Sequence, residues 1–160
     1  LPERLLPVKA TGIKPTRMLV GDVRPAAATD VTLEGRPSTT WRHVYQRDVP
    51  PEVLTAVVDG TLAFASLEHA VGRGAVTSAP DGTRWLGVSC VRVAESARRR
   101  GLARQIFTAL TSWAAEQGAT RCYVQVLDDN TPALRLYDAL GLRLHHRHRY
   151  VRADSLVAHA

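Results

Sequence analysis

The part of this sequence best suited to bind phosphate is a run of three arginines followed by glycine. Residues 98–100 are all arginine, Gly101 comes next, and Ala103 follows at the start of a helix-like segment. The first backbone N–H groups of a helix have no partner within the helix, and they lie at the positive end of its dipole. Small residues let an anion approach these groups, and arginine adds charge-assisted hydrogen bonds. Residues 98–104 therefore predict a site for a diphosphate.

The residues after this turn have the periodicity of an amphipathic helix. Gly118 stands where a left-handed glycine commonly ends a helix. The same arginines would also suit a solvated basic surface, so the turn alone leaves both interpretations open. It matches neither a phosphate-binding loop ending in Gly-Lys-Ser/Thr nor a Gly-x-Gly-x-x-Gly turn. The apolar stripe consists of Leu102, Ile106, Ala109, Leu110 and Trp113.

A second constellation places an asparagine and a tyrosine on one helix. Residues 122–127 alternate like a strand, and a helix is expected to follow, with Thr131 as its N-cap and Pro132 at its first position. Tyr137 lies seven residues after Asn130, which is about two helical turns, so both residues lie on nearly the same side. Taken separately, Asn130 also suits a turn, and Tyr137 also suits an apolar core.

Together these two constellations resemble the GNAT N-acetyltransferase superfamily. The pattern Arg/Gln-x-x-Gly-x-Gly/Ala after a strand ending in Val-x-Val is similar to its acetyl-coenzyme A site, and VLDDNTPALRLYDALGL is similar to the segment that closes over the cofactor. The resemblance covers roughly residues 31–152. It implies direct acetyl transfer from acetyl-coenzyme A, the cosubstrate, to a small-molecule or peptide amine that the sequence does not identify.

The resemblance also implies roles for individual residues. The backbone of Val91 and Val93 would hold the pantetheine arm and stabilise charge developing on the thioester carbonyl. Asn130 would contact the amide arm, and Tyr137 would face the sulfur. The residues expected around the diphosphate are Arg98, Arg99, Arg100, Gly101, Leu102, Ala103 and Arg104.

The sequence departs from the family pattern in two places. The family usually carries two helices between its first two strands, which help to form the acceptor site, and here that region is short. In addition, Arg99 stands where the family frequently has glycine.

The implied reaction needs a proton acceptor and a proton donor. An alkyl amine with a pKa of about 10.4 is only about one part in a thousand neutral near pH 7, so a base or a water chain is expected. A thiolate with a pKa near 8.5 departs, and tyrosine has a pKa near 10, so full proton transfer from Tyr137 is uphill by about 2 kcal/mol. A dry cleft narrows that gap. Tyr137 is therefore expected to be a hydrogen-bond donor or general acid, and Glu68, near a strand end, is the candidate base.

Composition and element order indicate one globular domain. The chain has 160 residues, of which 45% are hydrophobic and 22% charged. A hairpin is expected at residues 54–68 around Asp59-Gly60, followed by strand–helix–strand units. The expected fold is α/β, a GNAT-like mixed sheet with helices on both faces and splayed central strands. Residues 1–28 are expected to be a lead-in or linker, 29–153 the acetyltransferase domain, and 154–160 a C-terminal tail.

The net charge of +6 suits an anionic cofactor, and it also suits a nucleic acid. Nucleic-acid binding is not expected, because no aromatic residues alternate with the arginines to stack on bases. A non-catalytic acyl-coenzyme A-binding domain of a larger protein is the other alternative.

His145, His146 and His148 lie among arginines, which favours a solvated strand over a metal site. The sequence has neither an apolar run of membrane-spanning length nor a signal-peptide pattern. We expect a cytoplasmic protein that is a homodimer or part of a longer chain.

Overall fold

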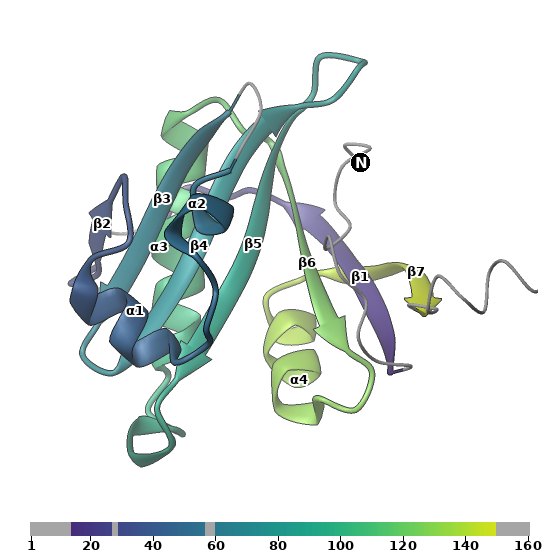
Figure 1. Ribbon diagram of the computed structural model, residues 1–160. Helices are drawn as coiled ribbons and strands as arrows, with labels where there is room; N and C mark the ends of the chain where they lie inside the picture. Colours follow the sequence, from purple (N-terminus) through teal and green to yellow (C-terminus); the bar gives the residue numbers. More distant parts are fainter. Residues whose placement is uncertain (1–13, 27–28, 57–59, 150–160) are drawn as a thin grey trace, which may run out of the picture.

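Seven strands form one sheet in the computed structural model, which describes residues 14–26, 29–56 and 60–149 (Figure 1). The strands are β1 (Pro15–Asp22), β2 (Thr32–Glu34), β3 (Thr61–Leu67), β4 (Ala70–Ser78), β5 (Arg84–Val93), β6 (Arg121–Leu127) and β7 (Arg143–Arg149). The helices are α1 (Thr39–Tyr45), α2 (Pro51–Leu54), α3 (Leu102–Glu116), α4 (Thr131–Ala139) and a short 3-10 helix, η1 (Glu95–Ala97). The strand order is β2-β3-β4-β5-β6-β1-β7.

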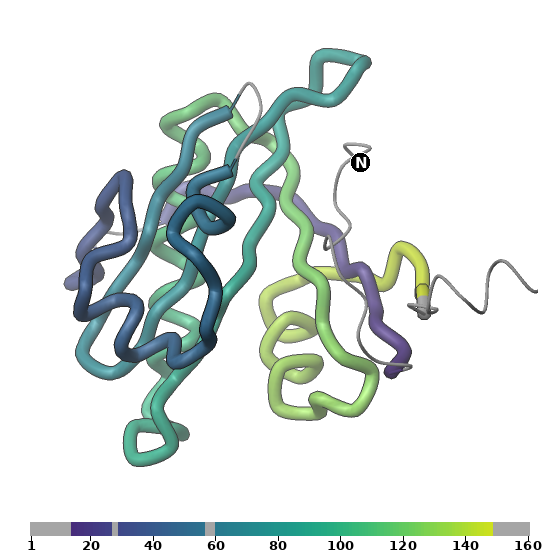
Figure 2. The backbone as a smooth tube through the Cα atoms, viewed as in Figure 1, coloured from purple at the N-terminus to yellow at the C-terminus, as the bar shows by residue number. Residues whose placement is uncertain are grey.

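The first described strand lies inside the sheet rather than before it. β1 pairs antiparallel with β6 on one side and with β7 on the other, as the chain trace in Figure 2 shows. Met18 and Leu19 of this strand are only 1% and 6% exposed. Residues 1–28 were expected to be a lead-in or linker, and the structure corrects this expectation for residues 15–22. The partners that bury β1 come from the last part of the chain, so no local pattern marks them.

The central strands β5 and β6 are splayed, which confirms that part of the predicted fold class. They are the parallel pair of the sheet, and their pairing runs only from Trp85↔Arg121 to Val88↔Val124. β5 then continues to Val93 and β6 to Leu127, and Figure 1 shows the two strands separating toward α4. β5 remains paired with β4, but the register between them shifts opposite Gly72. Cys90 has a φ of 58° at this point, so β5 carries a bulge, which bends the strand locally.

Helices cover both faces of the sheet, as predicted. Figure 1 shows α1 and α2 in front of β3 and β4 and α3 behind them. Trp41 of α1 is 1% exposed and its Nε1–H donates to the carbonyl of Gly72 at 3.1 Å. On the other face, a Cβ at Gly72 would lie 2.5 Å from Ile106 of α3, so the glycine allows close packing. Tyr137 of α4 joins the α3 cluster through Phe107.

The predicted hairpin at residues 54–68 is wrong in its first half. Residues 51–54 form α2, because Pro51 occupies the first helical turn, where its fixed φ is favourable. Residues 57–59, including Asp59 of the expected turn, lie outside the described residues. β3 pairs instead with β4, through a turn at Glu68 and His69. Two short helices thus occupy the region between β2 and β3. Of the helices in the described ranges, none is both long and apolar enough to cross a bilayer.

We predict that Leu19→Ala costs about 2–5 kcal/mol of unfolding free energy, because it leaves a cavity in the core. Leu33→Ala is the matched control, since Leu33 is also a strand leucine but is 37% exposed on β2. It should change the stability by about 0.5 kcal/mol or less. Urea denaturation followed by circular dichroism measures both values. Equal, small losses would contradict the burial of β1 in the sheet.

Candidate active site

The predicted diphosphate turn lies at the carboxyl end of β5. Gly101 is the N-cap of α3 with a φ of 73°, and Arg99 is also left-handed with a φ of 67°. A Cβ added at Gly101 would meet no heavy atom within 4 Å, so the space beside the helix N-terminus is open. The left-handed backbone also explains why glycine is favoured at the position of Arg99. The turn has the open backbone donors that an anion requires.

The arginines of the turn have different surroundings. The Nε–H of Arg98 donates to the carbonyl of Val93 at 3.2 Å, and the Nη1 of Arg100 lies 2.9 Å from a carboxylate oxygen of Glu68. The side chains of Arg99 and Arg104 are exposed. Arg98 and Arg100 therefore contact Val93 and Glu68, and Arg99 and Arg104 face solvent.

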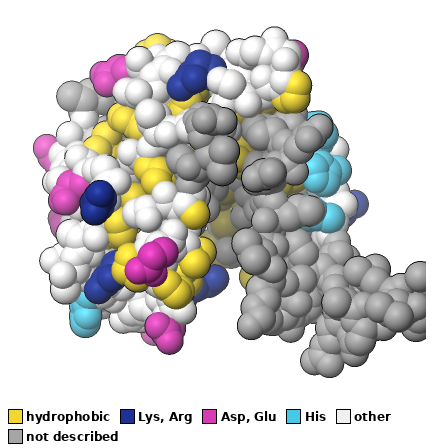
Figure 3. Space-filling view, turned by 45° about the horizontal axis from the view of Figure 1, so that its top comes forward, with side chains coloured by type: hydrophobic (Ala, Val, Ile, Leu, Met, Phe, Trp, Pro, Cys, Tyr) yellow, Lys and Arg dark blue, Asp and Glu magenta, His cyan; other side chains and the backbone are white. Residues whose placement is uncertain are grey.

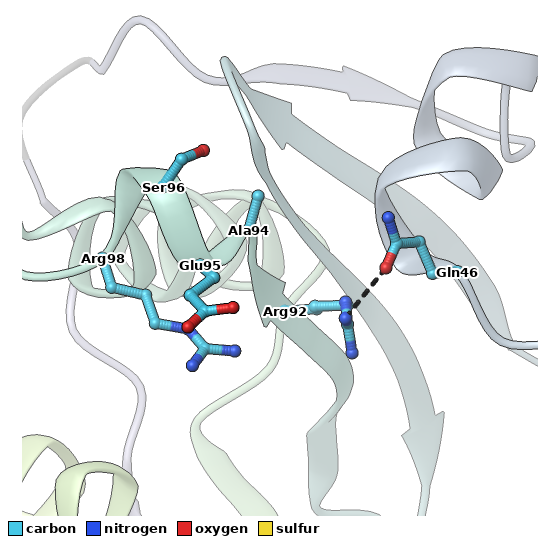
Figure 4. A pocket seen from close by; sticks show the side chains of 6 residues that line it. All are labelled: Gln46, Arg92, Ala94, Glu95, Ser96 and Arg98. Carbon is cyan, nitrogen blue, oxygen red and sulfur yellow. Dashed lines mark hydrogen bonds between the residues drawn. The ribbon is translucent and has the colours of Figure 1, made fainter.

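A broad cavity of about 560 Å³ opens beside this turn. In Figure 4 the side chains of Arg98 and Glu95 lie close together, and Arg92 donates to Oε1 of Gln46 at 3.0 Å. The Nε of Arg92 is buried and has no hydrogen-bond partner in the described part of the chain. Sequence reasoning missed Arg92, although a single arginine between Val91 and Val93 is a detectable signal. The cavity is lined by Gln46, Arg92, Ala94, Glu95, Ser96 and Arg98.

Glu68, the expected base, lies at the diphosphate end of the sheet. It follows β3 in the turn to β4 and pairs with Arg100. Arg73 on β4 is opposite Ser89, where the central strands have separated. The turn and the stretch of β4 from Ala70 to Arg73, which spans about 10 Å, separate Glu68 from Arg73. This position gives no geometric support to Glu68 as the base at the thioester.

Asn130 and Tyr137 lie on α4 as predicted, with different environments. The Oδ1 of Asn130 accepts a hydrogen bond from the backbone N–H of Ala133 at 3.3 Å, so Asn130 caps the helix. Tyr137 is 3% exposed, and its ring makes an edge contact with Phe107 at a centroid distance of 5.5 Å. Burial raises the pKa of Tyr137 to about 12. Its hydroxyl is therefore protonated, and able to donate, at any physiological pH.

A second, smaller cavity of about 160 Å³ lies where β5 and β6 separate. It opens on the face of α1 and α2, because Arg73 in its wall donates from Nε to the carbonyl of Leu54 at 2.7 Å. Burial raises the pKa of Tyr123, another wall residue, to about 12, and the charge of Arg73 acts in the opposite direction. Sequence reasoning missed both residues; Arg73 was detectable as the one charged residue in the strand sequence AVGRGAVTS. The cavity is lined by Met18, Arg73, Ala75, Gly87, Val88, Ser89, Tyr123 and Gln125.

The three histidines of β7 gather at one margin of the molecule in Figure 3. The Nδ1 atoms of His145 and His146 are 2.7 Å apart, and the rings of His146 and His148 are in edge contact. Within the described residues, no group of three or more His, Cys, Asp or Glu side chains is arranged to hold a metal.

Comparison with known proteins decides the family. A family model described as "Probable histone acetyltransferase Rv0428c C-terminal" matches residues 1–151. The chain belongs to this family. It is 45% identical to "Probable histone acetyltransferase Rv0428c" of Mycobacterium tuberculosis over 161 residues, which cover 98% of this chain and 53% of that protein. It is 31% identical to "Uncharacterized N-acetyltransferase YobR" of Bacillus subtilis over 69% of this chain and 40% of that protein. The chain thus spans about half the length of the curated relatives it matches, or less.

Solved structures agree on the fold. A GNAT acetyltransferase from Novosphingobium aromaticivorans aligns with a TM-score of 0.65 and 21% identity over 91% of this chain and 68% of that chain. The structure of AAC(6')-Iy with the bisubstrate analog CoA-S-monomethyl-acetylneamine aligns with a TM-score of 0.57 and 15% identity, over 78% of this chain and 98% of that chain. With the named relatives, these matches confirm the expected membership of the GNAT superfamily. Both curated relatives are named as acetyltransferases.

We predict that Tyr137 makes the stability of the protein fall above pH 10. Its pKa is 10.0 in the unfolded chain and about 12 in the folded one, so the unfolded state loses its proton first as the pH rises. The stabilisation from burying the neutral phenol is complete below pH 10 and is lost as the pH rises toward 12. Between pH 9 and pH 11, wild type should lose about 1 kcal/mol more unfolding free energy than Tyr137→Phe. Urea titrations at both pH values measure this difference, and parallel losses would refute the raised pKa.

Proposed function

We propose that this chain is an acetyl-coenzyme A-dependent N-acetyltransferase domain that transfers acetyl directly to an amine. The observation that carries the proposal is the separation of β5 and β6. The open turn at Gly101 and the cavity beside Arg73 both lie next to the place where these two strands separate. A thioester bound along one strand edge can then be reached by an amine from the cavity. GNAT membership and the acetyltransferase names of the relatives support this assignment.

The residues at the turn fit the diphosphate of acetyl-coenzyme A. Backbone donors of α3 are unobstructed at Gly101, and the exposed guanidinium groups of Arg99 and Arg104 add positive charge. Leu102 is buried beneath the turn and anchors it, while Arg98 and Arg100 are held by Val93 and Glu68. When bound, acetyl-coenzyme A supplies an activated acetyl thioester. Arg100 would be kept in place by Glu68, which we therefore assign as a positioning residue rather than a base.

The edge of β5 beyond Val88 provides backbone groups for the pantetheine arm. β5 and β6 are described throughout, and no ladder pairs join them after Val88 and Val124. Peptide groups of Val91 and Val93 on that edge have no β6 partner and could pair with an amide-bearing ligand in the manner of an added strand, except that the carbonyl of Val93 already accepts from Arg98. Ala103 leaves room at the first helical turn, and Asn130, which caps α4, lies beside the end of β6. These residues hold the arm against the separated strands.

Tyr137 is assigned to the departing sulfur. With a pKa of about 12, its phenol is a weaker acid than a thiol with a pKa near 8.5, so full proton transfer would cost about 5 kcal/mol in this environment. A hydrogen bond to the thiolate has no such cost and stabilises the charge as it develops. Tyr137 is therefore a hydrogen-bond donor in this proposal, and water completes the protonation.

The test of this function is binding followed by turnover. Acetyl-coenzyme A should raise the melting temperature, and linkage gives about 2.7 kcal/mol of stabilisation at a hundred times the dissociation constant. Release of free coenzyme A thiol with an amine panel then tests transfer. The panel includes small amines, amino acids and a lysine-containing histone peptide, because one relative is named a histone acetyltransferase. Binding without thiol release from any amine would favour a non-catalytic acyl-coenzyme A-binding domain.

We predict that Gly101→Val weakens coenzyme A binding about 10- to 100-fold, through lost charge-assisted hydrogen bonds to phosphate. Gly82→Val is the matched control, because Gly82 also has a positive φ, of 87°, and also leaves its Cβ position open. Both variants carry similar backbone strain, so only the loss of affinity should differ between them. Isothermal titration calorimetry measures the affinity for coenzyme A. Equal affinities in the two variants would show that the diphosphate does not bind at this turn.

We predict that Tyr137→Phe lowers kcat about 10²-fold and leaves the dissociation constant of acetyl-coenzyme A within about twofold. Phenylalanine keeps the ring and its edge contact with Phe107, so the variant removes only the hydroxyl. Steady-state thiol release measures kcat, and calorimetry measures the affinity. Wild-type turnover in this variant would show that Tyr137 is a core residue with no role at the sulfur.

A further inference from the structure

Arg73 is a partly buried cation whose described contacts include no acid. Its Nε donates to the carbonyl of Leu54 at 2.7 Å, its Nη1 to Oγ of Ser89 at 3.4 Å and its Nη2 to the carbonyl of Ala56 at 3.5 Å. No carboxylate among the described residues lies within ion-pair distance of it. Arg17 of β1 and Arg121 of β6, by contrast, do have acidic partners.

The two phenols that act on Arg73 are neutral at physiological pH. The titratable side chains that act on it are Cys90, Tyr123 and Tyr45, and burial lowers the pKa of Arg73 more than they raise it. Burial also raises the pKa values of Tyr45 and Tyr123 to about 12, so both phenols stay protonated. A partly desolvated guanidinium that has no counter-ion is costly, and an anionic ligand would offset that cost.

The cavity beside Arg73 is small and has directional polar groups. A guanidinium has five N–H donors, of which three are used in the contacts above, so two remain, and Arg73 lines the cavity. Its volume is about 160 Å³. Ser89, Tyr123 and Gln125 also line it, and none of its lining residues is acidic. The space suits a compact head group that carries a carboxylate.

We propose that Arg73 binds a carboxylate of the acceptor, so that the acceptor is a small amine bearing a carboxylate near its amino group. This inference rests on the proposed acetyltransferase function and specifies its substrate class. The planar guanidinium matches a carboxylate in a two-bond arrangement. The same positive charge disfavours the ammonium form of a nearby amine and so increases the neutral fraction that can attack. A cavity without an acidic base can therefore still favour the reactive form of the amine.

The test compares α-amino acids with their α-carboxamides, using release of coenzyme A thiol from acetyl-coenzyme A. The carboxamides have the less basic amines and are more neutral at a given pH, so a preference for the acids opposes intrinsic reactivity. Wild type should prefer the best amino acid over its carboxamide at least tenfold in kcat/KM. Arg73→Gln should lower kcat/KM for the acid about 10- to 100-fold, mainly through KM, with a clearly smaller loss for the carboxamide, which loses only the effect of the positive charge on its amine. Arg73→Lys keeps the charge and should retain part of the preference.

Arg84→Gln is the matched control. Arg84 donates from Nε to the carbonyl of Gln117 at 2.9 Å and from Nη1 to Oγ of Ser78 at 3.0 Å, which repeats the pattern of Arg73 outside the cavity. This variant should keep the wild-type preference. If Arg73→Gln does not fold, an acid preference in wild type that is reduced in Arg73→Lys supports the proposal.

Three outcomes would overturn the inference. If acetyl is transferred to a lysine peptide or to simple amines as efficiently as to amino acids, the acceptor needs no carboxylate. The acetyltransferase function would then still hold. Equal losses for acid and carboxamide in Arg73→Gln would give Arg73 a structural role. Absence of thiol release with every amine would end both the inference and the proposed function.

Discussion

The separation of β5 and β6 is the constraint on which the candidate site depends. Four residue pairs hold the strands together, and beyond Val88 the bulge at Cys90 keeps β5 with β4 while β6 diverges. A parallel pair inside a sheet normally satisfies its backbone groups by pairing along its length. Here the pairing stops early, so strand edges are left for a ligand at the centre of the molecule. Helix α3 begins at the end of β5 and therefore directs its N-terminus to the same opening.

The opening connects two environments of different character. The turn around Gly101 is broad, basic and exposed, which suits phosphates that remain partly hydrated. The cavity beside Arg73 is small and lined by aliphatic groups, phenol and amide, without an acid. Positive charge is common to both sites, but its effect differs because the guanidinium of Arg73 is partly desolvated and those of Arg99 and Arg104 are not. Gln46, the C-cap of α1, lines the broad cavity, and Leu54 of α2 accepts from Arg73, so both cavities adjoin the helices on one face of the sheet.

Predictions from the sequence were most accurate where the signal is local. The start of α3, the stripe that buries it and the existence of α4 depend on residues within a few positions of one another, and all are found in the structure, although the cap of α4 is Asn130 and not the expected Thr131. Glu68 shows the limit of such reasoning. An acidic residue near a strand end has no local feature that says which end of the sheet it will occupy, and the β3–β4 turn brings it to Arg100. The error in the first half of the hairpin expected at residues 54–68 arose similarly, because apolar residues after two prolines suit a short helix as well as a strand.

By itself, the sequence determined the phosphate-type turn, the helices that follow it and the superfamily, since these reside in short runs of residue types with a fixed spacing. Only the tertiary structure decided that β1 lies between β6 and β7, because its pairing partners are about a hundred residues away along the chain. It also decided that Arg73, Ser89, Tyr123 and Gln125, from three strands, border one cavity. Strand order and register decide which side chains meet across a sheet, and both depend on long-range pairing. Such pairing produces no fixed spacing of residues that could be recognised in the sequence.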